Sequence, residues 1–355
     1  MFWAKRERGD AAAPPAPGAG LSPPPARTGR TARSGRRPGR TRGEFVLWSA
    51  AALWLGACAI SALTPDADDY ERTSLLALLM AGTGGGLALA ACAAPTLPTS
   101  FAKRLRELGP WLAVLPVILV AWELATAKFD LLPRPFFAAP QSLIEVFTDD
   151  YKRLGDSVLH SLLLLLGGYV IGAALGFVTG VAVGWSRTIG YWVHPVLRLV
   201  GPLPATAWLP LAFFAFPTSH SASTFLIALA TGFPVTVLTW SGVASVNRAY
   251  YDVARTMGAS RTFLVLKVAI PAAMPSVFVG LFMGLGASFA VLVVAEMMGV
   301  KAGLGWYLQW AQGWAAYANM YAALLVMALM CTGLITLLFR ARDRLLAWQK
   351  GLVQW

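Results

Sequence analysis

Charged side chains are scarce in this sequence. Asp, Glu, Lys and Arg make up 13% of its 355 residues, whereas a soluble domain carries about 25%. Hydrophobic residues make up 57%, and the mean hydropathy is +0.60. This balance excludes an ordinary soluble domain and indicates a chain that lies largely within a lipid bilayer.

Cysteine and histidine are equally rare, with three residues of each. Cys58, Cys92 and Cys331 all fall inside apolar runs, which favours small buried side chains over a disulfide framework or a zinc site. The apolar runs contain no H-x-x-x-H pattern and no paired carboxylates. These absences argue against a membrane-embedded enzyme, so we predict no catalytic residue and no metal site.

Long apolar runs are what the sequence does contain. A membrane crossing needs roughly 20 apolar residues, and backbone polar groups in a bilayer must be satisfied within a helix or a closed barrel. The runs are continuous rather than alternating, so they predict helices and not barrel strands. Eight runs qualify: 45–63, 74–98, 110–127, 157–185, 188–216, 222–246, 268–295 and 315–339.

Lysine and arginine are distributed unevenly between the segments that join these runs. If the N-terminus is cytoplasmic, the inside segments hold 22 of the 29 basic residues and the outside segments hold 6. Cytoplasmic loops of membrane proteins carry the excess of positive charge. The chain is therefore predicted to cross the membrane eight times with both termini inside, which places the segment 247–267 in the cytoplasm.

Much of the basic excess lies in one tail. Residues 1–43 hold 10 basic and 2 acidic residues in a sequence rich in Pro, Gly and Arg, which predicts a disordered cytoplasmic tail. We expect either contact with anionic lipid, or a role in setting the topology only, or a true start downstream of Met1. The pI near 10.0 then requires no nucleic-acid partner, and none is predicted.

A glycine repeat runs through the fourth run, "GYVIGAALGFVTGVAVG". A spacing of four residues places these glycines on one face of a helix. Small residues on one face let a neighbouring membrane helix approach closely. The repeat therefore predicts tight helix packing, within or between subunits, and no substrate site. Its members are Gly168, Gly172, Gly176, Gly180 and Gly184.

The fifth run contains four prolines and is followed by a fifth at 217, and each removes a backbone donor and clashes with the preceding turn. One straight helix is therefore excluded. Broken helices at membrane depth are buried in protein or line a watery cavity. We predict that the break lines a translocation pathway, with a kinked packing helix as the alternative. The predicted lining residues are Pro202, Pro204, Trp208 and Pro210.

Ionisable residues are rare within the runs and at their ends, and we single out Glu123, His194, Arg198 and Glu296. Such groups are costly in a bilayer and are often functional. Each lies near the end of its run, however, where a long side chain reaches the interface. Glu296 precedes the Gly-rich segment "MMGVKAGLGW", and we predict that it belongs to the pathway or its gate.

The cytoplasmic segment between the sixth and seventh runs has the signals of two short helices. Residues 247–257 have a helix-compatible composition, and Gly258 can end that helix by taking a positive φ. Ser260 can cap a second helix over 261–270. Two prolines then mark the entry into the next run, Pro271 and Pro275.

The stretch "DVARTMGASRTFLVLKVAIPAAMP" resembles the EAA loop found in permeases of binding-protein-dependent ABC importers. Ala254, Gly258 and the hydrophobic–Pro pairs at 270–271 and 274–275 match the pattern of that loop. Asp252 stands where the loop usually has Glu, and Val253 replaces its first Ala. Three further segments and the glycine repeat resemble the nitrate/sulfonate/taurine/bicarbonate branch, namely "GPLPATAWLPLAFFAF", "AEMMGVKAGLG" and "LLPRPFFAAPQSLIEVF".

This resemblance covers roughly residues 110–345 and implies an all-α membrane protein with the six-helix core of a type I ABC importer permease. The family usually has Arg at the position of Gly201, and a Gly-rich turn where "FPTSHSAST" stands. The two N-terminal runs lie outside the resemblance, and we expect them to pack against the core as an extra hairpin. The predicted divisions are the tail 1–43, the hairpin 44–100, the permease domain 101–345 with its loop 247–271, and the cytoplasmic tail 346–355.

Permeases of this kind form a dimeric pore in the bacterial inner membrane. The resemblance therefore implies four partners, which are an ABC ATPase dimer, a second permease copy, an extracytoplasmic solute-binding protein and membrane lipid. The sequence contains no G-x-x-x-x-G-K-[ST] motif. We thus predict no cofactor in this chain, no enzymatic activity of its own, and ATP and Mg²⁺ bound by the ATPase.

The resemblance also assigns the cytoplasmic loop as the segment that couples to the ATPase. Asp252 and Arg255 would contact the ATPase or brace the loop, and Ala254 and Ala259 would permit close approach. Gly258 would make the turn. The complete predicted set is Asp252, Ala254, Arg255, Gly258, Ala259, Ser260, Pro271 and Pro275.

The predicted function is that of the permease subunit of an ATP-driven importer for a small anionic solute. Nitrate, sulfonates, taurine, bicarbonate and pyrimidine precursors all remain open, because selectivity resides largely in the binding protein. An ATPase-independent secondary transporter or channel is the alternative. It would show internal repeats with charged residues at the membrane midplane, and the sequence contains no clear repeat.

Overall fold

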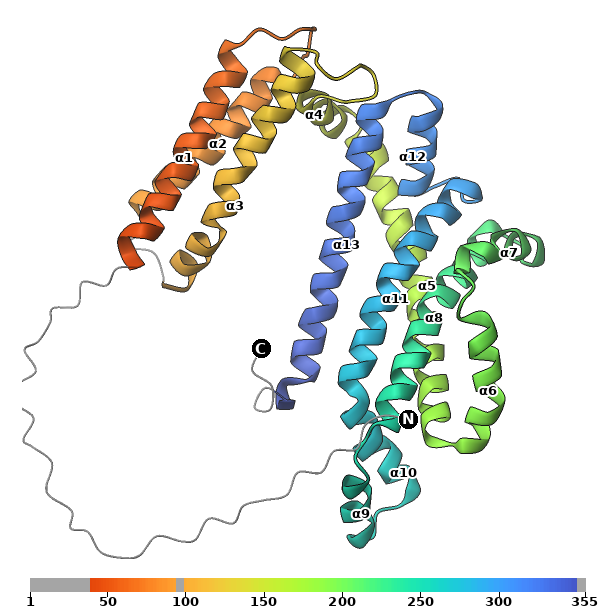
Figure 1. The fold of residues 1–355 in the computed structure, drawn as a ribbon. Helices are drawn as coiled ribbons and strands as arrows, with labels where there is room; N and C mark the ends of the chain where they lie inside the picture. The colour runs from red at the N-terminus through yellow and green to blue at the C-terminus, as the bar shows by residue number, and fades with distance from the viewer. Residues whose placement is uncertain (1–38, 94–98, 350–355) are drawn as a thin grey trace, which may run out of the picture. The chain divides into compact units, whose positions relative to one another are not determined.

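The computed structural model describes residues 39–93 and 99–349, and every regular element in these two ranges is helical. Seven helical segments are long and apolar enough to cross a membrane, and one bent pair brings the number to eight. The predicted all-α polytopic fold is confirmed (Figure 1). The seven segments belong to α1 (Gly39–Leu63), α2 (Thr73–Cys92), α3 (Thr99–Glu123) with its π turn η1 (Leu124–Lys128), α5 (Tyr151–Trp185), α8 (Ser219–Ala244), α11 (Ile270–Met298) and α13 (Tyr317–Leu345).

The predicted terminal tails lie largely outside the described residues. Residues 1–38 and 350–355 belong to those tails, and 94–98 are the end of the second predicted run. Residues 39–43 were predicted to end the disordered tail, but they form the first turn of α1. Within the predicted C-terminal tail 346–355, the last described element is the short helix η4 (Ala347–Gln349).

The five glycines of the repeat pack α5 against α8. Gly168 lies against Ile227 and Gly184 lies against Val243, so both positions advance by sixteen residues and the two helices run parallel. A Cβ on any of the five would come within 2.4–2.7 Å of an atom of α8. The first four are buried and Gly184 is half-buried. The absence of a side chain is what allows this contact in a bilayer, where packing drives association.

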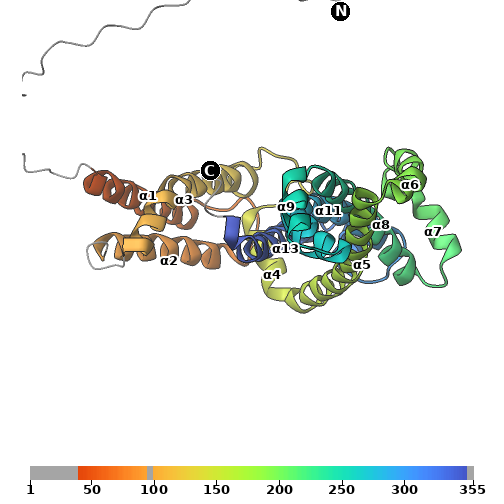
Figure 2. The same cartoon turned by 90° about the horizontal axis from the view of Figure 1, so that it is seen from below.

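On its other side α8 packs against α11 (Figures 1 and 2). Gly242 meets Ala273, whereas Thr231, further back along α8, meets Gly284. These two helices therefore run antiparallel. The central layer of the fold is thus α5, α8 and α11, and apolar side chains from all three form its main buried cluster.

The segment between α5 and α8 crosses back over the membrane, because those two helices run parallel. It does so as a bent pair, α6 (Arg187–Val200) followed by η2 (Ala205–Trp208) and α7 (Leu209–Ala215), with an angle of 87° at the break. The break falls at "GPLP", where Pro202 and Pro204 lack backbone donors. Eight crossings place the start of α1 and the end of α13 on the same side, and the cytoplasmic identity of that side stays a prediction from charge.

The N-terminal hairpin of α1 and α2 is joined to α3 through a buried polar cluster. Lys128 Nζ lies 2.8 Å from Asp66 Oδ1 and 3.6 Å from Glu123 Oε1. Glu123 Oε1 also accepts hydrogen bonds from Ser61 Oγ at 2.7 Å and from Gln141 Nε2 at 2.9 Å. The cluster therefore connects α1, the loop after it, α3 and α4 (Pro140–Asp149).

The prediction for the second cytoplasmic helix is partly wrong. It was expected to end near residue 270, with Pro271 and Pro275 marking a separate entry into the membrane. Instead, α10 (Arg261–Phe263), η3 (Leu264–Ala269) and α11 form one helical run from Arg261 to Met298. The π turn η3 widens the backbone just before Pro271, which accommodates a ring that would clash with a regular α turn.

Candidate functional site

The loop 247–271, which the charge balance predicts to be cytoplasmic, contains a helix–turn–helix whose two helices are capped as the sequence predicts. Asn247 Oδ1 accepts a hydrogen bond from the Ala249 amide at 3.0 Å and caps α9 (Arg248–Thr256). Gly258 takes a φ of +82° after α9. Ser260 Oγ accepts a hydrogen bond from the Phe263 amide at 3.3 Å and caps α10.

The turn itself is a Schellman motif. The Ala259 amide donates to the Ala254 carbonyl at 3.1 Å, and the Gly258 amide donates to the Arg255 carbonyl at 2.9 Å. Ala254 and Ala259, both predicted as coupling residues, are half-buried partners in this motif. Their backbone groups therefore form the turn.

One face of α9 is docked on the ends of the membrane helices. The Tyr251 ring packs edge-on against Trp185 with centroids 5.8 Å apart, and partial burial raises the pKa of its hydroxyl. Both rings also line a polar cavity of about 570 Å³. Its lining includes three arginines, Arg187, Arg248 and Arg255.

The other face of α9 presents three large apolar side chains to solvent. Tyr250, Val253 and Met257 are 63%, 61% and 83% exposed. Their spacing of i, i+3 and i+7 places them on one stripe of the helix. Sequence reasoning missed this stripe, although its helical spacing was visible, because it followed the loop motif rather than the periodicity.

The remaining predicted coupling residues fall in two places. Asp252 and Arg255 form an exposed ion pair at 3.5 Å on α9. The pair joins two neighbouring turns of the helix, and both charges stay in solvent. Pro271 and Pro275 lie further on, in the first turns of α11. The structure therefore does not bring these two prolines together with the α9 residues.

The break between α6 and η2 borders a cavity of about 320 Å³. Gly201 and Pro204 line it, together with Ala287 and Ala290 of α11. Phe233 of α8 fills the space beside Gly201, where a Cβ would lie 2.5 Å from its ring. An arginine, which the family resemblance leads one to expect at 201, would displace that ring.

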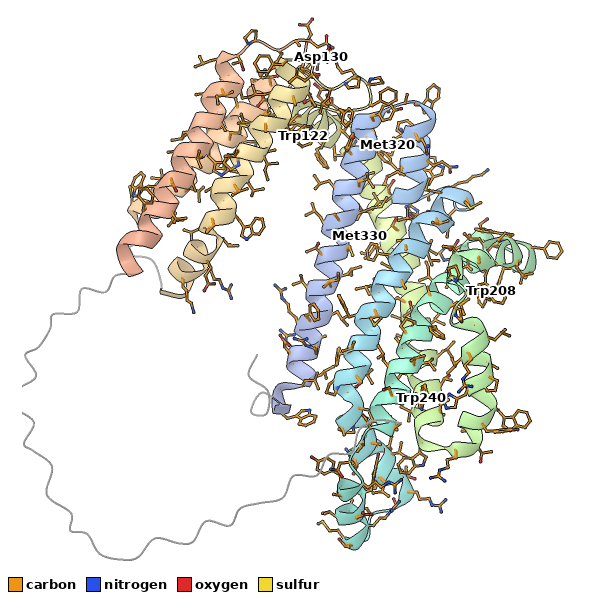
Figure 3. The ribbon with its side chains drawn as sticks, in the orientation of Figure 1. Trp122, Asp130, Trp208, Trp240, Met320 and Met330 are labelled. Carbon is orange, nitrogen blue, oxygen red and sulfur yellow. The ribbon has the colours of Figure 1, made fainter. Side chains whose placement is uncertain are left out.

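The other predicted pathway residues near the break differ in their surroundings. Pro202 and Pro210 are exposed on this chain. The Trp208 indole N–H is buried and has no hydrogen-bond acceptor among the described residues, and Figure 3 shows Trp208 beyond the break, well away from Trp240. It is a free donor next to the cavity-lining segment.

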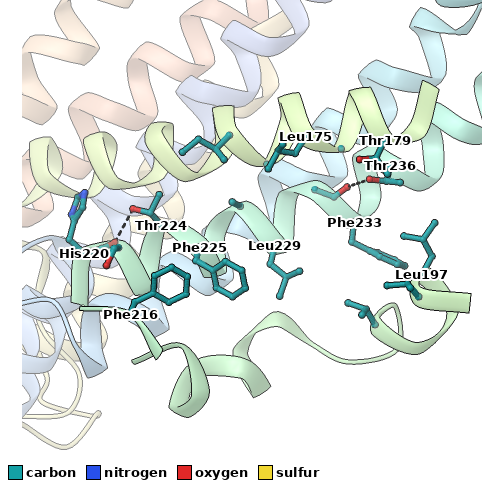
Figure 4. Close-up of a pocket in the computed structure, with 18 residues that line it drawn as sticks. Leu175, Thr179, Leu197, Phe216, His220, Thr224, Phe225, Leu229, Phe233 and Thr236 are labelled. Atoms are coloured by element: carbon teal, nitrogen blue, oxygen red, sulfur yellow. Dashed lines mark hydrogen bonds between the residues drawn. The ribbon is translucent and has the colours of Figure 1, made fainter. Parts of the chain in front are cut away.

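A larger cavity of about 750 Å³ separates α6 from α5 and α8 (Figure 4). Its walls are almost entirely apolar, and Phe233 and Leu197 approach each other across it near one end. His220 and Thr224 lie at the other end, at the start of α8. Both cavities share Val200, Leu229 and Phe233 as lining residues.

Glu296 is buried and fully hydrogen-bonded. Its Oε1 accepts a hydrogen bond from Ser161 Oγ at 2.7 Å and its Oε2 accepts one from the Gly305 amide at 2.7 Å. Ser161 Oγ also accepts from the Leu304 amide at 2.8 Å. This arrangement holds the start of α12 (Leu304–Gly313) after Gly303, whose φ is +102°. The geometry favours a brace, and the pathway role of Glu296 stays a prediction.

Comparison with known proteins decides what kind of molecule carries these features. Residues 168–348 match the family model described as "Binding-protein-dependent transport system inner membrane component". The chain belongs to this family. The permease is thus an inner-membrane transport component that crosses the membrane several times, as its sequence predicted.

Curated relatives of the permease agree with this family. It is 28% identical over 259 residues to the nitrate import permease protein NrtB of Synechococcus elongatus, covering 70% of this chain and 91% of that one. It is 31% identical to a probable ABC transporter permease protein of Brucella abortus, covering 70% of this chain and 98% of that one. It is 32% identical to the bicarbonate transport system permease protein CmpB of Synechococcus elongatus, covering 56% and 68%.

Proposed function

We propose that this permease and a second copy of it form the translocation pathway of an ATP-driven importer for a small anion. A separate ATPase dimer would supply the energy and an extracytoplasmic binding protein would deliver the solute. Nitrate, bicarbonate and small sulfonates are the solute class that the similarity to NrtB and CmpB supports.

The exposed apolar stripe on α9 is the observation that carries this proposal. A short helix with no buried residue gains little stability from burial within its own chain. Its apolar face points into solvent while its opposite face rests on Trp185. Exposed apolar residues grouped on one helix face mark a binding surface, and this one lies at the end of the membrane helices that the charge balance makes cytoplasmic.

We propose that the solute pathway passes the break between α6 and η2. Gly201 and Pro204 line a cavity there, and the unused Trp208 indole N–H offers a donor to an anion. Backbone that leaves helical geometry at membrane depth is tolerated where it lines such a cavity.

The coupling proposal is tested by replacing Val253 with Glu in the complete transporter. A carboxylate in the apolar stripe should abolish co-purification of the ATPase, because a charge would be buried without a partner in the contact. Arg248→Gln is the matched control, since Arg248 is exposed on the opposite side of the same helix. It should leave the complex intact.

Membrane insertion is measured in parallel by the yield of folded permease in detergent. Normal insertion with loss of the ATPase supports the proposal. If Val253→Glu retains the ATPase and the wild-type uptake rate, α9 is not the coupling helix. If the wild-type permease moves solute without any ATPase, the ATPase-independent transporter is correct instead.

A further inference from the structure

Arg198 lies deep in the membrane region, and its depth follows from the contacts of α6 with α8. The His194 ring packs on the Trp240 ring with centroids 4.3 Å apart. One contact further along, Gly201 lies against Phe233. Both helices advance by seven residues between these contacts in opposite directions, so Arg198 is level with the part of α8 near residue 236.

This level is well inside the hydrocarbon core. Residue 236 lies two turns before Ala244, the end of α8, which is about 12 Å at the rise of an α-helix. The 26 residues of α8 span about 39 Å, and a hydrocarbon core of about 30 Å centred on them ends roughly 5 Å before Ala244. The backbone of Arg198 is therefore about 7 Å inside that edge.

The environment of Arg198 differs from that of the buried charged groups Glu123, Lys128 and Glu296. Glu123 and Lys128 are buried against each other, and Glu296 accepts two hydrogen bonds. Arg198 is exposed, and no carboxylate or hydrogen-bond acceptor within residues 39–93 and 99–349 pairs with it. A lone guanidinium in lipid is costly, so something polar must face it.

Helix geometry gives the side of α6 on which Arg198 lies. It is four residues after His194 and three before Gly201, so it shares a flank with both. Gly201 lines only the cavity at the break, Val196 and Leu197 line only the large apolar cavity, and Val200 lines both. Arg198 lines neither cavity, and it lies one helical turn from the cavity at the break.

We propose that Arg198 faces the water-filled pathway and binds the transported anion as it passes the break. This inference rests on the proposed function and adds a residue that determines its charge selectivity. A guanidinium is always charged and presents a planar fork of donors, which matches the oxygens of nitrate, bicarbonate or a sulfonate. The competing arrangement, a guanidinium extended to a lipid phosphate, is an outcome of the test.

Thiol labelling tests the placement without any solute. In a permease whose Cys58, Cys92 and Cys331 are replaced by Ala, Arg198→Cys and Leu199→Cys are compared in the assembled transporter. Both positions are exposed on one chain, with Leu199 at 74%, but Leu199 points away from α8. A membrane-impermeant anionic methanethiosulfonate reacts with thiolates, which form in water and not in lipid.

The expected result is at least a tenfold faster reaction for Arg198→Cys than for Leu199→Cys. A side chain that merely extends to the lipid surface gives the opposite outcome, because the shorter thiol stays in the hydrocarbon region. Equally slow reaction at both positions overturns the proposal.

Transport then tests the contact with the anion. Uptake of nitrate, bicarbonate and taurine is measured per ATP hydrolysed for the wild type, Arg198→Lys and Arg198→Gln. Loss of charge should lower the uptake per ATP at least tenfold, and Lys should restore part of it, which a purely structural role would not produce. Unchanged uptake in Arg198→Gln overturns the anion contact.

Failure of the proposed function is distinguishable from failure of this inference. If the proposed function is wrong, the wild type itself moves none of the three anions, although ATP is hydrolysed. Fast labelling would then retain Arg198 as a pathway residue, and its role in binding an anion would be rejected together with the anionic solute class.

Discussion

At Gly172 a Cβ would lie 2.4 Å from the Ala228 carbonyl oxygen and 2.8 Å from the Ala228 Cα. Both atoms belong to backbone, so no rotamer change relieves the clash. Gly172→Ala should therefore force α5 and α8 apart and destabilise the permease by at least the 1–3 kcal/mol or so typical of overpacking. Thermal unfolding in detergent measures the effect.

Gly167 provides the control for that substitution. It lies in the same helix, five residues earlier, and a Cβ there would meet nothing within 4 Å. Gly167→Ala should be neutral or slightly stabilising, because Ala favours a helix. An equal loss of stability in both variants would contradict the packing role of the repeat.

Gly258 is constrained by its backbone rather than by space. Its φ is +82°, and a Cβ there would contact no atom within 4 Å. Gly258→Val should cost about 1–2 kcal/mol of local strain and loosen the turn between α9 and α10, so ATP-driven uptake falls while insertion stays normal. Gly258→Asn should retain more uptake than Val, because Asn tolerates this conformation. Wild-type uptake in the Val variant would reject the turn as a coupling element.

At the scale of elements, the N-terminal hairpin depends on one buried cation. The Lys128 side chain is 1% exposed and contacts the carboxylates of Asp66 and Glu123. Lys128→Met should leave those acids without their partner and destabilise the permease by roughly 3–5 kcal/mol, seen as a lower unfolding temperature.

Lys103 is the matched control at the other end of α3. It forms an exposed pair with Glu107 at 3.9 Å, and exposed pairs contribute only about 0.2–1 kcal/mol. Lys103→Met should change the unfolding temperature little. A similar small effect at Lys128 would show that the hairpin is held mainly by apolar contacts.

The sequence predicts those elements that local signals specify. The caps at Asn247 and Ser260, the positive φ of Gly258 and the five-glycine face all follow from residue types at fixed spacing. The glycine spacing predicts a packing face but does not say which helix fills it, because that choice depends on contacts between distant segments.

Other features depend on long-range contacts and were not visible in the sequence. The cluster around Lys128 joins residues more than 60 positions apart, and the π turn before Pro271 arises from how a continuous helix accommodates a proline. Asp252 and Arg255 were correctly placed on a short helix, but the apolar stripe beside them required attention to periodicity rather than to the motif.

At the scale of the whole molecule, the parallel arrangement of α5 and α8 fixes the topology. The segment 186–218 must cross the membrane once, and the short link before α8 must lie on the side opposite to α9. In a permease without its native cysteines, Thr218→Cys should react with an impermeant reagent added outside intact cells, and Thr256→Cys only after the cells are opened.

Both residues are exposed, so their access to reagent depends on the side of the membrane alone. The reverse pattern, with Thr256→Cys labelled from outside and Thr218→Cys only after the cells are opened, would mean that the bent pair is a re-entrant loop and that the membrane region has seven crossings.

The helical run from Arg261 to Met298 is 38 residues long, or about 57 Å at the rise of an α-helix. It begins one residue after the cap that closes the cytoplasmic turn, and it ends two residues after the carboxylate that holds the start of α12. It therefore links the turn after α9 to the turn before α12 through one continuous helical run. If a partner rotates α9, as the proposed function requires, the movement reaches the start of α12 along one continuous helix, with no intervening loop to absorb it.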